Sequence, residues 1–128
     1  MQKLEQLKTF EDACQVLELD PEKVIPDFSW YPEEDKASME AHAKLVIIAK
    51  AANLLANDGT DWTTDWDNDD EWKYYPLFDM EGGSSGFRFY AHGRSASVVG
   101  SRLCFVSREA ARYVGERFID LYKAYFVI

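Results

Sequence analysis

A long amphipathic segment at residues 33–57 constrains the fold of this chain most strongly. Three acids at positions 33–35 fill its first turn, where negative charge suits the positive end of a helix dipole. Gly59 follows its end, as helix terminators often do. Its apolar residues recur at helical spacing and form a stripe wide enough to be mostly buried. The sequence therefore predicts a central helix with the rest of the chain packed around it.

Shorter patterns flank this helix. Thr9 is a good N-cap and predicts a helix that ends near Leu19, before Asp20 and Pro21. Segments 71–80 and 87–91 read as a β-hairpin around a Gly- and Ser-rich turn at 82–86. A further turn is expected at 93–97 and a third strand at 101–106. Ser107 is expected to cap one continuous final helix, whose apolar stripe reaches Tyr125.

These elements predict a single α+β domain spanning residues 1–128. The expected order is helix, helix, three-stranded antiparallel sheet, helix, with a single layer of helices on one sheet face. The aromatic residues of segment 26–32 are expected to pin that segment onto the core. The predicted core comprises Leu45, Ile48, Leu55, Phe89, Leu103, Phe105, Val114, Phe118 and Leu121.

Charge is spread unevenly along the chain. The net charge is −9, of which residues 1–87 carry −13 and residues 88–128 carry +4. This balance opposes direct nucleic-acid binding, which needs concentrated positive charge. The chain has no run of about 18 apolar residues and no secretory signal, so we expect a cytoplasmic protein with no membrane association. Cys14 and Cys104 lie in apolar segments and are expected to be buried free thiols.

An acidic loop is the first candidate site. Asp65, Asp67 and Asp69 alternate as the first ligands of a calcium loop do. Asp70 stands where such a loop needs glycine, and Pro76 stands where it needs a bidentate glutamate. We therefore expect a solvated acidic loop, with no metal and no cofactor.

Aromatic and basic side chains give two more candidates. A stacking platform for sugars or bases is suggested, against the alternative of ordinary core aromatics, by Trp62, Trp66, Trp72, Tyr74 and Tyr75. Arg108 and Arg112 lie one helical turn apart and suggest a contact for an anionic partner, against simple pairing of Arg112 with Glu116. No catalytic residues are assigned. The candidate binding residues are Trp62, Trp66, Asp65, Asp67, Asp69, Asp70, Arg108 and Arg112.

Several stretches taken together carry a resemblance. They are KLVIIAK at 44–50, DWDN at 65–68 with EWKYYP at 71–76, VGSRLCF at 99–105 and FIDLYK at 118–123. With these, the chain resembles a group of short uncharacterised proteins carried by phages and prophages of gut bacteria. The resemblance covers most of residues 44–128, with a weaker echo at 9–14. It implies a phage-related setting and supplies no catalytic residues.

Three functions remain open from the sequence. The favoured one is a non-catalytic module that binds a host or phage protein. The second is an acidic mimic of nucleic acid that blocks a host DNA-binding protein. The third is a small enzyme of unknown class, for which His92 and Cys104 are the candidate residues. The sequence leaves the oligomeric state open.

Overall fold

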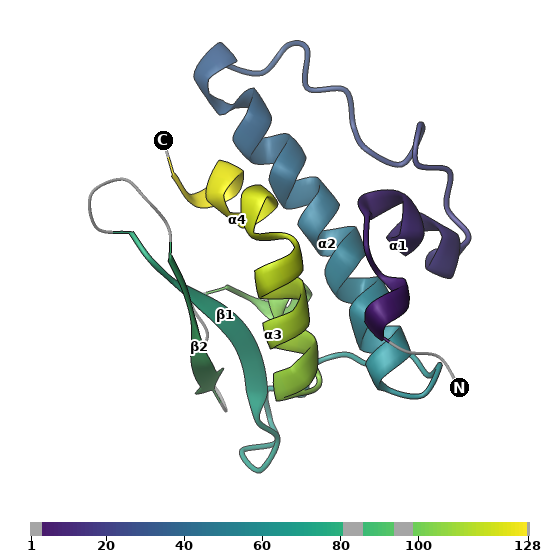
Figure 1. Cartoon of the computed structure of the whole chain (residues 1–128), viewed down its shortest axis with the longest axis vertical. Helices are drawn as coiled ribbons and strands as arrows, with labels where there is room; N and C mark the ends of the chain where they lie inside the picture. Colours follow the sequence, from purple (N-terminus) through teal and green to yellow (C-terminus); the bar gives the residue numbers. More distant parts are fainter. Residues whose placement is uncertain (1–3, 81–85, 94–98, 128) are drawn as a thin grey trace.

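The computed structural model describes residues 4–80, 86–93 and 99–127 (Figure 1). Most of the regular structure is helical. The helices are α1 (Phe10–Leu17), α2 (Lys36–Ala56), α3 (Arg108–Arg117) and α4 (Ile119–Phe126), and the strands are β1 (Lys73–Asp79) and β2 (Gly86–Gly93). Short 3-10 turns occupy Leu4–Gln6, Glu33–Asp35 and Ser101–Leu103. Within this part of the chain, no helix combines the length and hydrophobicity that crossing a membrane requires.

The predicted central helix is confirmed. α2 packs against α1 on one side and against α3 and α4 on the other, and the two strands pack against α3 (Figure 1). Gly59 adopts a φ of 80°, and its N–H donates to the carbonyl of Leu54 at 2.8 Å. This left-handed turn ends the helix where the sequence indicated.

The predicted N-caps are also confirmed. The Thr9 hydroxyl accepts from the Asp12 N–H at 3.1 Å, and the Asp12 carboxylate accepts from the Thr9 N–H at 3.0 Å. This reciprocal capping box starts α1. Ser107 starts α3 by accepting from the Ala110 N–H at 3.1 Å.

The expected α+β architecture with a three-stranded sheet is wrong. β1 and β2 pair antiparallel in a two-stranded ladder, with a register shift between Tyr74 and Pro76. Residues 101–106 form a 3-10 turn and then a single bridge from Phe105 to Tyr74 rather than a strand. The backbone groups beside Phe105 instead bind the side chain of Asn53 on α2. α3 packs along both strands of the ladder, and α4 meets β1 through Phe78, whose ring lies 4.9 Å from that of Tyr122 and 5.7 Å from that of Phe126.

The continuous final helix is also wrong, because the chain bends at Phe118. This residue has φ −111° and ψ 31°, which ends α3 and precedes α4. Gly115, in the last turn of α3, has low helix propensity and favours such a break. Both Phe118 and Tyr122 are buried, so the bend keeps the apolar side chains of both short helices inside.

Most predicted core residues are buried as expected. Leu121 is only partly buried, and the side chain of Phe89 lies outside the described residues. Cys14 and Cys104 are buried free thiols, as predicted. The prediction that Trp30 pins its segment onto the core is wrong, because its side chain is 96% exposed. The turns expected at 82–86 and 93–97 lie largely outside the described residues.

Candidate functional site

The acidic loop folds through hydrogen bonds among its own residues. The Asp65 carboxylate accepts from the Asp67 N–H at 3.1 Å, and the Asn68 side chain accepts from the Asp70 N–H at 3.0 Å. Asp and Asn favour such turns because their short side chains reach the backbone two residues further on. Part of the acidic composition is therefore explained by local turn formation.

Lys73 brings a buried ammonium group to this loop. Its side chain is fully buried, and its Nζ donates to the Asn68 carbonyl at 3.0 Å. The same Nζ lies 3.4 Å from the Glu71 carboxylate and 5.3 Å from the centre of the Trp66 ring. Glu71 in turn accepts from the Asp65 N–H at 2.8 Å. The positive charge beside the loop residues Asn68 and Glu71 is thus supplied by a lysine side chain of the protein itself.

The described residues contain no group of three or more His, Cys, Asp or Glu side chains placed to share a metal ion. The carboxylates of Asp65, Asp67, Asp69 and Asp70 belong to exposed residues on the outside of the loop. The Glu71 carboxylate lies near the Lys73 ammonium, at 3.4 Å.

Trp66 connects the loop to a distant part of the chain. Its indole N–H donates to the Ser101 hydroxyl at 2.6 Å, and the Thr64 hydroxyl donates to the same oxygen at 2.8 Å. Trp66 and Trp62 are both half-buried. The Trp66 N–H is therefore already engaged within the protein, which leaves its exposed ring surface for any partner.

The two candidate arginines lie elsewhere, on the exposed face of α3. Arg112 Nε lies 3.9 Å from the Glu116 carboxylate, one helical turn away, and both side chains are more than half exposed. An exposed pair of this kind contributes little stability and is easily exchanged. Arg108 is exposed at the start of the same helix.

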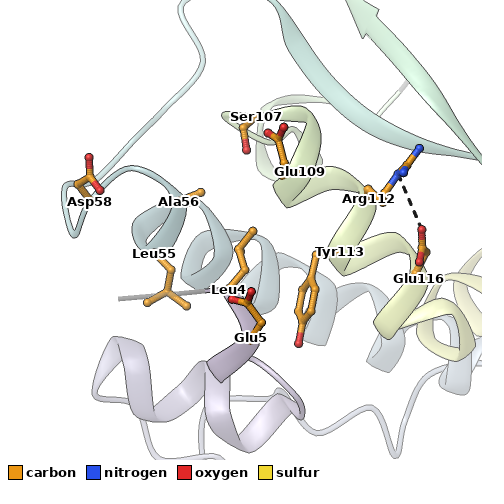
Figure 2. A pocket seen from close by; sticks show the side chains of 10 residues that line it. All are labelled: Leu4, Glu5, Leu55, Ala56, Asp58, Ser107, Glu109, Arg112, Tyr113 and Glu116. Carbon is orange, nitrogen blue, oxygen red and sulfur yellow. Dashed lines mark ion pairs between the residues drawn. The ribbon is translucent and has the colours of Figure 1, made fainter. Parts of the chain in front are cut away.

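A groove of about 700 Å³ opens beside Arg112 (Figure 2). Three segments distant in sequence build it: the turn Leu4–Gln6, the end of α2, and α3. Its apolar lining comes from Leu4, Leu55, Ala56 and Tyr113. Its polar lining comes from Glu5, Asp58, Ser107, Glu109, Arg112 and Glu116.

The fixed polar groups of this groove are already used in the fold. The Tyr113 hydroxyl donates to the Leu7 carbonyl at 2.8 Å, and burial raises the pKa of this hydroxyl. The Ser107 hydroxyl caps α3. Within the described part of the chain, the carboxylates of Glu5 and Glu109 have no ion-pair partner. The groove therefore offers an apolar floor with unpaired negative charge around it.

Sequence reasoning missed this groove and the exposure of Trp30. The groove residues lie at 4–5, 55–58 and 107–116, and no spacing in the sequence links them. Trp30 lies between α1 and α2, inside a turn that the Tyr31 N–H closes by donating to the Phe28 carbonyl at 2.9 Å. The rings of Phe28 and Tyr31 pack edge to face, with centroids 6.0 Å apart.

The residues suggested for an enzyme form no described pair. The Cys104 thiol is buried and donates to the Gly100 carbonyl at 3.3 Å, while the His92 side chain lies outside the described residues. The other cysteine, Cys14, is not one of these candidates. Burial raises the pKa of its thiol, and the charges of Glu11 and Asp20 raise that pKa further. A raised pKa keeps a thiol protonated and weakly nucleophilic.

Comparison with known protein families, curated proteins and solved structures gave no match. Function must therefore be inferred from the geometry of this chain.

Proposed function

We propose that this protein is a non-catalytic module that binds another protein. The observation that carries the proposal is Trp30, whose side chain is 96% exposed on the segment between α1 and α2. Tyr31 beside it is 43% exposed. Large aromatic side chains facing water are typical anchors of protein interfaces.

The physical gain from covering Trp30 is large. A tryptophan buries about 150–250 Å² in a contact, which corresponds to roughly 4–6 kcal/mol of hydrophobic free energy before the entropic costs of binding. The turn that links Phe28 to Tyr31 holds the neighbouring backbone in place. Such preorganisation lowers the entropy lost when a partner binds.

The surface of α2 favours a binding module over a nucleic-acid mimic. Lys36 lies 2.9 Å from the Glu33 carboxylate, and Lys44 lies 3.2 Å from that of Glu40. Acids paired with lysines in this way do not form a row of phosphate-like charges. Because the sequence resembles proteins of phages and prophages, we propose a phage or host protein as the partner.

Capture of partners by the immobilised protein, followed by quantitative mass spectrometry, tests this proposal. We expect Trp30→Ala to lose the proteins that the parent chain enriches from a gut-bacterial lysate, and Trp30→Phe to retain most of them. Because Trp30 is exposed, both variants should unfold at nearly the parental temperature. Equal capture by the parent chain and Trp30→Ala would contradict the proposal.

A further inference from the structure

We infer that the groove between the turn Leu4–Gln6, the end of α2 and α3 docks a basic, partly apolar segment of a partner protein. This inference rests on the proposed function only in taking a protein as the ligand. It concerns a different surface, because Trp30 precedes α2 whereas the groove lies at the other end of that helix (Figures 1 and 2). The 21 residues of α2 span about 30 Å at 1.5 Å per residue.

The shape of the groove suits a side chain with an apolar stem. Its volume of about 700 Å³ is of the order that ligand-binding pockets have. Leu4, Ala56 and Tyr113 contribute apolar surface from three separate elements. Burying a methylene group on such a surface is worth about 0.8 kcal/mol, so the long stems of lysine and arginine contribute as well as leucine does.

The charges that line the groove favour a positively charged ligand. Its lining contains four carboxylates, those of Glu5, Asp58, Glu109 and Glu116, and a single guanidinium, that of Arg112. The only ion pair among these groups is the exposed 3.9 Å contact of Arg112 with Glu116. Basic groups along a docked segment can therefore pair with carboxylates of the lining without first breaking a strong internal contact. The net charge of −9 also attracts a basic segment from a distance.

These features together point to a segment in which lysine or arginine alternates with an apolar residue. A metal ion does not fit the observations, because no described group of three or more potential ligands converges on one point. A nucleic acid does not fit them either, since its phosphates would meet the carboxylates.

Fluorescence anisotropy with a short labelled peptide of alternating lysine and leucine tests the inference directly. The groove variant Glu5→Gln/Asp58→Asn/Glu109→Gln removes three carboxylates, and asparagine suits the positive φ of 55° at position 58. We expect it to bind the peptide at least about tenfold more weakly than the parent chain at about 150 mM salt.

A matched control separates the groove from the overall charge of the protein. The variant Glu11→Gln/Glu22→Gln/Asp61→Asn makes the same change in net charge at exposed positions outside the groove. We expect it to bind within about twofold of the parent chain. Equal weakening in both triple variants, or no binding by the parent chain at that salt concentration, would overturn the inference.

A second peptide with serine in place of leucine tests the apolar floor. We expect it to bind at least about fivefold more weakly. Equal affinity for both peptides, or full competition by spermidine at matched charge, would show that charge alone attracts the ligand and would overturn the docking of an apolar segment.

Trp30→Ala distinguishes this inference from the proposed function. It should leave the affinity for the peptide unchanged, because Trp30 does not line the groove. If the peptide fails to bind while capture still depends on Trp30, the groove inference falls and the proposed function stands. If the peptide binds and Trp30→Ala captures partners normally, the groove inference stands and the proposed function falls.

Discussion

The buried side chain of Asn53 binds the main chain on both sides of Phe105. Its amide donates to the Cys104 carbonyl at 2.9 Å, and its oxygen accepts from the Val106 N–H at 2.8 Å. On the other side, Phe105 exchanges two backbone hydrogen bonds with Tyr74, at 2.8 and 3.3 Å. The Asn53 side chain thus supplies, on this edge of the segment, the two backbone hydrogen bonds that a neighbouring strand could supply.

Replacing Asn53 by Ala should destabilise the protein by about 2–4 kcal/mol, because two backbone groups lose their partners. Urea denaturation measures this loss. Asn57→Ala is the matched control: the Asn57 amide donates to the Thr60 carbonyl at 3.0 Å in an exposed position, so the cost should stay below about 1 kcal/mol. Similar costs for the two variants would mean that the Asn53 contacts contribute little.

Tyr122→Phe should leave the free energy of unfolding unchanged or raise it by up to about 1 kcal/mol. The buried Tyr122 hydroxyl has no hydrogen-bond partner among the described residues, so its removal ends an uncompensated desolvation. Tyr113→Phe is the contrasting variant and should lose about 1 kcal/mol, because its hydroxyl donates to the Leu7 carbonyl. Thermal or urea unfolding of both variants checks the opposite signs. A clear loss in Tyr122→Phe would contradict this prediction.

The same hydroxyl predicts a loss of stability at alkaline pH. Burial raises the pKa of Tyr122 far above its ordinary value, and the neighbouring Cys104 adds to the shift. Above about pH 10, the unfolded chain releases this proton while the folded chain retains it, so the free energy of unfolding falls as pH rises. Below about pH 10 the folded and the unfolded chain both keep this proton, so the free energy of unfolding does not change with pH on account of Tyr122.

Tyr122→Phe should therefore gain stability relative to the parent chain as pH rises from 8 to about 11. Denaturation curves at several pH values measure this difference. Tyr113→Phe should show a smaller effect of the same kind, because burial raises the pKa of Tyr113 while the Arg117 guanidinium lowers it. Parallel pH profiles for the parent chain and Tyr122→Phe would rule the mechanism out.

Lys73→Met should destabilise the protein by about 2–4 kcal/mol, because it leaves the Asn68 carbonyl and the Glu71 carboxylate without their ammonium partner. Chemical denaturation measures the loss, and tryptophan fluorescence should report a changed environment for Trp66, which lies over the same ammonium. The double variant Lys73→Met/Glu71→Gln should recover part of the stability, because it also removes the unpaired charge. An additive double variant would show that the two residues are not coupled.

Local signals in the sequence predicted the helix ends well. Thr9, Ser107 and Gly59 each act on backbone groups within a few residues, so their effect can be read without knowing the rest of the fold. The apolar stripe of α2 predicted the central position of this helix equally well. A wide apolar face has to be buried, and this holds for any set of neighbouring elements.

The errors arose where distant residues decide the structure. The alternation at 101–106 satisfies a strand pattern, yet residues 101–103 turn into a 3-10 helix and Phe105 makes a single bridge to Tyr74. Asn53, about fifty positions earlier, binds the opposite edge of this segment. The residue type of Trp30 favours burial, yet hydrophobicity does not reveal whether the fold offers a site that covers this side chain, and Trp30 is exposed. The groove joins three remote segments and left no trace in local spacing.

The place of Lys73 inside the acidic loop has a consequence for the conditions under which the loop keeps its shape. A loop organised by calcium opens when the ion is withdrawn, whereas this loop carries its positive charge on a covalent tether from β1. We therefore expect a chelator to leave the conformation of this loop unchanged, because the Lys73 ammonium that binds the Asn68 carbonyl cannot be withdrawn.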